Sequence, residues 1–177
     1  GRLARKVDLR YLMVVGVSLM ILSLWEMTLF TAEISSWDIV RTGVIQGLGL
    51  GLVFVPLSTM AFSTLAPKFR TEGTALFSLI RNIGSSIGIS VVTTYLAHRI
   101  QINHETFSQY ITSFSLPLKM ASEHGMYDIS TQAGLMSIDA EVNRQAAILG
   151  YLQDYRLMMF VCFIMLPLLF LLKRARD

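Results

Sequence analysis

The sequence contains a single cysteine and few charged residues. Cys162 is the one thiol in 177 residues, so an intramolecular disulfide framework is excluded. Charged residues make up 15% of the chain, whereas soluble domains carry about a quarter, and 53% of the residues are hydrophobic. This balance favours a membrane protein over a soluble domain.

The sequence also lacks the motifs that are typical of soluble enzymes. The sequence has no phosphate-binding loop, nucleophile elbow or paired-cysteine motif, and its three histidines lie without metal-ligand spacing. We therefore expect no enzyme, no cofactor and no metal site. The formal net charge of +3 does not indicate a nucleic-acid partner, because the basic residues flank apolar runs and act as topology signals.

Long apolar runs are the main feature of the sequence. Four runs are long enough to cross a bilayer, which takes about 20 mostly apolar residues. The predicted fold class is an all-α polytopic membrane protein with four transmembrane helices, at about residues 11–32, 39–65, 74–97 and 155–172. The remaining parts are a cytoplasmic basic loop (1–10), a long extracytoplasmic loop with short amphipathic helices (98–154) and a cytoplasmic tail (173–177).

The long loop carries two helical patterns. Phe107, Tyr110, Ile111 and Phe114 recur at i, i+3, i+4 and i+7, which indicates a short amphipathic helix. Asp139 is a candidate cap for a second helix that runs towards the last span. Two roles are open for this segment, a solvated loop or a docking surface.

Basic residues indicate the orientation of the spans. Four basic residues lie in residues 1–10, two in the link 66–73 and three in the tail, so one side of the membrane has nine. The opposite side has five, spread over a much longer length of chain. The positive-inside rule then places both termini in the cytoplasm. Trp25 and Trp37 fall near the outer interface, where indole rings prefer to lie.

The second and third spans are rich in small and polar residues. The second carries several glycines, a Ser/Thr cluster and Pro56, which permits either a broken helix or a plain kink. The third contains the small-xxx-small pattern Gly84 to Gly88, a packing signal. We therefore expect these two spans to be buried against other helices and the first and fourth to be more peripheral.

Arg81 is the charge most deeply placed in a span. A charge there costs about 2.5–3.5 kcal/mol, so it is expected to face a cavity or a partner. Helical spacing puts it on the same face as Phe77, Gly84 and Gly88. Two roles stay open, an inter-helix anchor or a part in substrate or proton handling, while Asn82 points about 100° away and is expected to bond a neighbouring helix.

Glu26 is the one carboxylate inside an expected span. It stands beside Trp25, less than two turns from the outer end. An interfacial position is favoured, and proton coupling is the weaker alternative.

Two runs resemble a known family. IQGLGLGLVFVPLSTMAFSTL, followed by RTEGTALFSLIRNIGSSIGISVVTTYL, resembles the end of fourteen-span drug:proton antiporters of the EmrB/QacA type, in the major facilitator superfamily. The opening GRLARKVDLR is similar to that superfamily's G-x-L-x-D-R type loop, although Arg5 stands where an acidic residue is usual. The resemblance covers nearly the whole chain.

The resemblance implies the C-terminal part of a proton-coupled multidrug efflux transporter in the bacterial inner membrane. Its substrates would be amphipathic drugs or toxins, exported by alternating access. Its partners would be protons, the lipid bilayer and, in Gram-negative relatives, a periplasmic membrane-fusion adaptor and an outer-membrane channel. The second span would line the cavity, with Gln46, Phe54 and Met60 as candidate contacts because polyspecific sites are mostly apolar and aromatic. Arg81, Asn82, Gly84 and Gly88 would lie where the two halves of the transporter meet.

Two alternatives remain from the sequence. One is a free-standing four-span scaffold or accessory subunit, which the absence of an initiator Met argues against. The other is a metabolite transporter of the same fold. A metabolite carrier would ignore structurally unrelated dyes, whereas a multidrug exporter would not.

Overall fold

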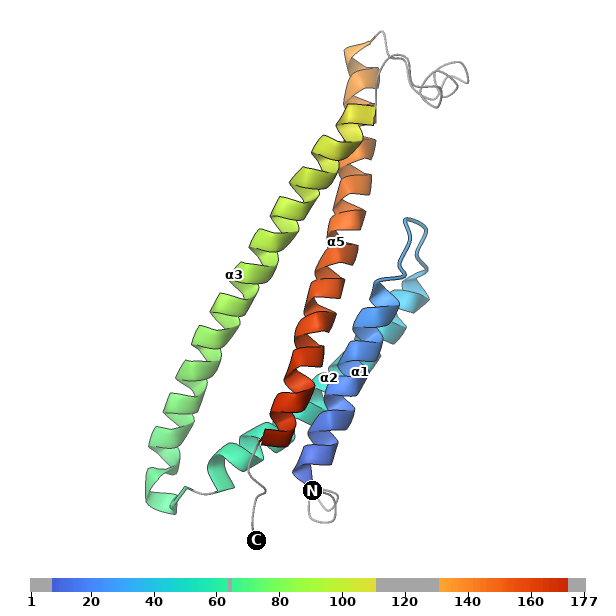
Figure 1. Ribbon diagram of the computed structural model, residues 1–177. Coiled ribbons are helices and arrows are strands. Elements are labelled where there is room, and N and C mark those ends of the chain that lie inside the picture. Colours follow the sequence, from blue (N-terminus) through green and yellow to red (C-terminus); the bar gives the residue numbers. More distant parts are fainter. Residues whose placement is uncertain (1–7, 64, 111–130, 172–177) are drawn as a thin grey trace. The chain divides into compact units, whose positions relative to one another are not determined.

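The computed structural model describes residues 8–63, 65–110 and 131–171. In these ranges the chain forms helices α1 (Leu9–Met27), α2 (Ser36–Ser63), α3 (Arg70–Tyr110) and α5 (Gln132–Leu171), with the 3-10 turn η2 (Pro67–Phe69) between α2 and α3 (Figure 1). All four α-helices are long and apolar enough to cross a membrane, and no strand occurs in the described ranges. The all-α polytopic fold class is confirmed.

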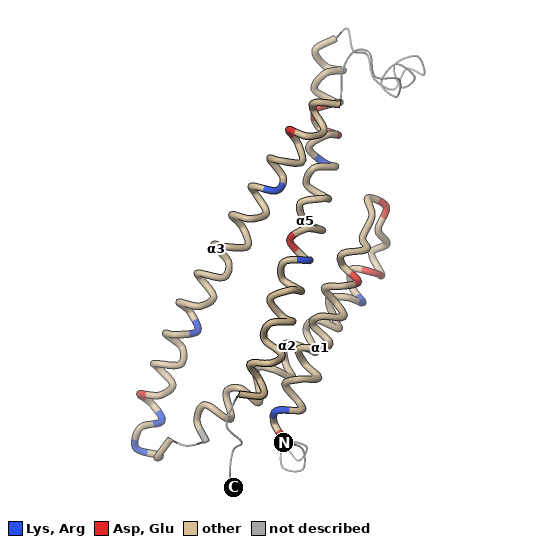
Figure 2. The backbone as a smooth tube through the Cα atoms, viewed as in Figure 1, with Lys and Arg blue, Asp and Glu red and all other residues tan. Residues whose placement is uncertain are grey.

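The chain divides into two compact units. Unit 1 comprises Gly1–Val92 and Tyr155–Asp177, and unit 2 comprises Thr93–Asp154. Figure 2 shows that charged residues are sparse along the helices of both units, as the composition requires.

Within unit 1, α1 and α2 are joined by a short turn and lie side by side (Figure 1). The Asp8 side chain caps α1 by accepting from the backbone N–H of Arg10 at 3.3 Å. Gly16 and Gly49 allow the close approach of the two helices, because a Cβ on either would lie 2.7 Å from the other's carbonyl oxygen. The buried Ser23 hydroxyl donates to the carbonyl oxygen of Thr42 at 2.8 Å and ties the same pair of helices.

The buried core of unit 1 is built on α1. Met13, Val17 and Leu24 of α1 cluster with Cys162 and Leu169 of α5. The rings of Phe30 and Tyr155 meet edge to face, with centroids 6.5 Å apart. The last helix is therefore anchored on the first by apolar packing.

The order of burial differs from the sequence-based expectation. Within unit 1, α1 supplies more of the buried residues than α2 or the α5 stretch of that unit, whereas no residue of α3 is buried by the described part of the chain. Among the described residues, a Cβ on Gly43, Gly47, Gly51, Gly84 or Gly88 would meet nothing within 4 Å. The small-residue faces of α2 and α3 are therefore uncovered by the helices described.

α2 is continuous through Pro56, which lies buried within it. A proline there removes one backbone hydrogen bond. The Ser58 and Thr59 hydroxyls donate to the carbonyl oxygens of Phe54 and Val55, four residues back, at 3.0 and 2.8 Å. The hydroxyls next to Pro56 therefore bond their own helix.

Unit 2 is an antiparallel pair formed by the end of α3 and the start of α5. A Cβ on Gly150 would lie 2.7 Å from the Ile100 side chain, and the Asn103 amide donates to the carbonyl oxygen of Ala146 at 3.4 Å. These helical stretches continue α3 and α5 and are not separate short helices.

The predicted cap at Asp139 is wrong. α5 begins at Gln132, and Thr131 caps it by accepting from the backbone N–H of Gly134 at 3.2 Å. Of the amphipathic stripe, Phe107 and Tyr110 belong to the end of α3, while Ile111 and Phe114 fall outside the described residues. The loop motif at residues 1–7 also falls outside them.

Candidate functional site

Arg81 faces α2 and stacks on an aromatic ring. Its guanidinium carbon lies 5.2 Å from the centroid of Phe54, a cation–π contact between α3 and α2. Both side chains are exposed in this chain, Phe54 by 40%. Arg81 and Phe54, predicted separately as an inter-helix residue and a cavity residue, are thus brought together. A ring face stabilises a cation without neutralising it, so the guanidinium keeps its charge and its donors.

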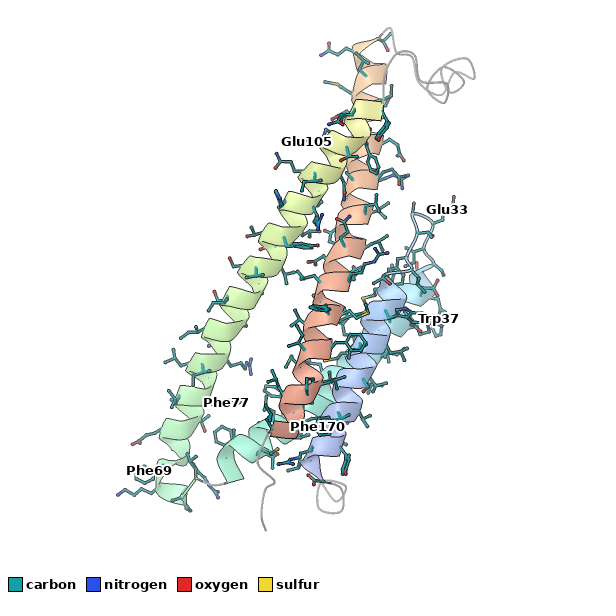
Figure 3. All side chains as sticks on the ribbon, in the orientation of Figure 1. Glu33, Trp37, Phe69, Phe77, Glu105 and Phe170 are labelled. Atoms are coloured by element: carbon teal, nitrogen blue, oxygen red, sulfur yellow. The ribbon has the colours of Figure 1, made fainter. Side chains whose placement is uncertain are left out.

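A second aromatic contact supports the first. The rings of Phe62 on α2 and Phe77 on α3 meet edge to face at 5.4 Å, and Phe77 precedes Arg81 by one turn (Figure 3). Gly73 lies against Leu65 at the start of the same helix pair. We call Phe54, Phe62, Phe77 and Arg81 the α2–α3 seam. It fixes Arg81 against α2 on the face predicted from helical spacing.

The other predicted cavity residues do not join this seam. Gln46 is half-buried on α2. Met60 packs against the core cluster built on α1, which gives it a packing contact in this chain. Asn82, Gly84 and Gly88 are exposed on α3. The Asn82 carbonyl accepts from the Ser85 hydroxyl at 3.0 Å, and within the described ranges its side-chain amide makes no hydrogen bond.

Glu26 has a partner that the sequence analysis missed. Its Oε2 lies 3.2 Å from Arg41 Nη2, which joins the end of α1 to the start of α2. A pocket of about 370 Å³ adjoins the pair, lined also by Trp25, Phe30 and Glu33. The short link between the two spans, with a carboxylate before it and an arginine after it, is the signal that predicts this pair.

Unit 2 holds polar contacts across and along its helices. His104 Nε2 lies 3.2 Å from Asp139 Oδ1, and Asn143 donates to the other oxygen of Asp139 at 3.1 Å. Arg144 donates two hydrogen bonds to Glu141, at 2.8 and 2.7 Å. These bonds from Arg144, with one from Gln145, lower the pKa of Glu141 to about 2. Glu141 is therefore ionised at neutral pH.

The described residues contain no group of three His, Cys, Asp or Glu side chains placed to hold a metal. The contacts described are those of helix packing, ion pairing and aromatic stacking.

Comparisons with known proteins bear on these contacts. The fatty acid resistance protein FarB of Neisseria gonorrhoeae is 24% identical over 174 residues, which cover 98% of this chain and 34% of FarB. The multidrug export protein EmrB of Haemophilus influenzae is 24% identical over 156 residues, 85% of this chain and 30% of EmrB. The probable multidrug resistance protein EmrY of Escherichia coli K12 is 24% identical over 171 residues, 96% and 33% of the two chains.

The chain thus spans about a third of the length of these relatives. No protein-family model and no solved structure matches it. The resemblance to transporters of the EmrB type is confirmed by the relatives, which are consistent with the C-terminal part of such proteins.

Proposed function

We propose that this chain, a homologue of multidrug export proteins of the EmrB type, forms the last four spans of a proton-coupled exporter of amphipathic compounds. The observation that carries this proposal is the alignment with FarB over 98% of the chain. Its four apolar helices support a multi-pass membrane protein. Export by alternating access needs two halves around a central cavity, and these four helices would supply part of one half.

The uncovered faces of α2 and α3 support this assignment. The open glycines Gly43, Gly47 and Gly51 mark one face of α2, and Gly84 and Gly88 mark α3. Small residues let helices pack closely in a membrane. In the proposed transporter these faces meet other helices, with α2 lining the cavity and α3 lying where the two halves meet.

The α2–α3 seam gives Arg81 its role in this proposal. The guanidinium is held over Phe54 at 5.2 Å, on the helix that would line the cavity. Movement of α3 against α2 would break the contact, so the pair would act as an inter-helix latch during alternating access. Gln46, Phe54 and Met60 remain our cavity candidates, and Met60 also packs against the core cluster built on α1 in this chain.

The proposed location is the bacterial inner membrane, with both termini of the chain in the cytoplasm. On this topology residues 98–154 would lie on the outer side of the membrane. α3 has 41 residues and α5 has 40, against the about 20 needed to cross a bilayer. In a Gram-negative cell, unit 2 would contact a membrane-fusion adaptor that leads to an outer-membrane channel.

Dye efflux from cells that express the complete transporter tests the proposal. We expect energised cells to export a lipophilic dye, and structurally unrelated amphipathic compounds to compete with it. Arg81→Ala should weaken export more than Arg81→Lys, because lysine keeps a cation for the Phe54 ring. A transporter that ignores unrelated dyes but moves one metabolite would overturn the multidrug assignment. Unchanged export by both Arg81 variants would refute the proposed role of Arg81 as an inter-helix latch.

A further inference from the structure

Unit 2 contains a close helix seam built on small residues. Ala146 is fully buried, and Gly150 approaches Ile100 and Leu96 of α3. Val142 is also buried, one turn before Ala146. These α5 residues follow one another at i, i+4 and i+8 and therefore share one face of the helix. That face packs against α3.

Asp154 continues this face one turn beyond Gly150. It is 3% exposed, and its Oδ1 atom is buried without a hydrogen-bond partner in the described chain. The two carboxylates earlier on α5 differ, since Asp139 contacts His104 and Asn143, and Glu141 accepts from Arg144. Asp154 thus combines deep burial with the absence of any described ionic partner.

The charged and titratable groups of α3 and α5 near Asp154 do not neutralise it. On α3, the Arg99 guanidinium lies 5.1 Å from the Tyr95 ring centroid and forms no ion pair with a described carboxylate. His98 is exposed, and so is Arg156, two residues further along α5. Within the described ranges, none of these four side chains makes a hydrogen bond or ion pair with Asp154.

Burial without a partner shifts the equilibrium of this carboxyl group towards the neutral acid, relative to a carboxyl group in water. Taking an ionised carboxylate out of water without a partner is costly, and the group protonates instead. Burial accordingly raises the pKa of Asp154, which lies one residue before the expected membrane span 155–172. Glu26 differs from Asp154 in having an ionic partner, because Arg41 Nη2 lies 3.2 Å from its Oε2.

We propose that Asp154 is a proton-binding site, protonated while the α3–α5 seam of unit 2 is closed and deprotonated when the seam opens and water reaches the carboxyl group. The proton is taken from and returned to water, and the carboxylate is the base. This inference rests on the proposed proton-coupled function and names a residue for it. Opening near Leu96 and Ile100 would couple the charge of Asp154 to helix separation.

Infrared spectroscopy of the complete, purified transporter with ¹³C-labelled aspartate tests the site without any transport step. We expect the band of one protonated carboxyl group to persist to a higher pH than that of a free aspartate, and to disappear in Asp154→Asn. Asparagine has the shape of the neutral acid, so the variant should fold. Glu141→Gln is the matched control, and it should leave the band unchanged because Glu141 is ionised. If Asp154→Asn does not fold, a pH titration of the carboxyl band in the labelled wild-type protein still tests whether one aspartate has a raised midpoint. A titration without any aspartate midpoint above that of a free side chain would overturn the proposal.

Dye-transport measurements then distinguish a failure of the proposed Asp154 site from a failure of the proposed exporter function. We expect Asp154→Asn to lose uphill dye export and to retain downhill dye exchange, with the pH dependence of export flattened. Glu141→Gln should behave as wild type. Unchanged uphill export and pH profile in Asp154→Asn would refute a coupling role. A wild-type protein that shows the infrared band but moves no dye would refute the exporter assignment while leaving the protonated carboxyl group in place.

Discussion

The guanidinium of Arg81 lies over the ring of Phe54, with 5.2 Å between its central carbon and the ring centroid. Arginine within an apolar run therefore has a defined partner on the neighbouring helix. Such a contact contributes about 0.5–2 kcal/mol, depending on how far it is removed from water. The contact offsets part of the free-energy cost of placing the charge in a membrane span, and it leaves the guanidinium charged.

A double-mutant cycle measures this contact. Phe54→Leu and Arg81→Ala should each lower the thermal unfolding midpoint of the detergent-solubilised transporter. The double variant should cost less than the sum of the two, with a coupling of about 0.5–2 kcal/mol. Phe160→Leu on α5, an exposed aromatic residue outside the seam, is the control, and it should show no coupling with Arg81→Ala. Strictly additive losses at Phe54 and Arg81 would mean that the contact does not stabilise the protein.

The approach of α1 to α2 makes a second prediction. Gly49→Ala should destabilise the protein by about 1–3 kcal/mol, because the new Cβ would lie 2.7 Å from the Gly16 carbonyl oxygen and backbone must shift. Gly47→Ala, two residues earlier, meets no described atom within 4 Å and is the matched control when this chain is tested by itself. Thermal unfolding or folded yield after membrane extraction checks both. Equal tolerance of the two substitutions would contradict the close approach of the helices.

The buried hydrogen bond from Ser23 to Thr42 makes a third prediction. Ser23→Ala should cost about 1 kcal/mol, because the carbonyl oxygen of Thr42 loses a buried donor. Ser18→Ala is the control on the same helix, since the exposed Ser18 hydroxyl bonds only the Val14 carbonyl within α1 in the described chain. Chemical denaturation of the two variants compares the losses. A larger loss for Ser18→Ala than for Ser23→Ala would count against the inter-helix role.

Glu141 makes a prediction about pH. Its pKa is lowered from 4.5 to about 2, first by the hydrogen bond from Arg144. A lowered pKa means that the pair's contribution to stability is complete above about pH 4.5 and is lost as the pH falls through about 2. Arg144→Gln should therefore raise the pKa of Glu141 towards 4.5, as followed by carboxyl NMR titration. An unchanged midpoint in that variant would refute the pairing.

Periodicity predicted much of what unit 1 displays. Arg81 and Phe77 share a face because they are one turn apart, and the structure turns that face to α2. The four apolar runs also predicted the four helices, since burying apolar surface in lipid requires satisfied backbone groups.

Other features depend on contacts that a single sequence does not reveal. α3 and α5 continue well past the apolar runs, because unit 2 is held by the small residues Ala146 and Gly150 and not by a long hydrophobic stretch. The ring under Arg81 belongs to another helix, and no local pattern selects Phe54 over the other aromatic residues of α2. The burial of α1 exceeded expectation because it packs against both α2 and α5.

Proton-driven dye movement in inside-out vesicles that contain the complete transporter tests the central claim most directly. We predict that an imposed pH gradient, acidic inside, drives dye uptake, that dye uptake dissipates the gradient, and that a protonophore abolishes both. Vesicles without the transporter should show neither effect. Dye uptake that does not depend on the pH gradient would contradict a proton-coupled exporter. A pH gradient that dye uptake does not dissipate would contradict it as well.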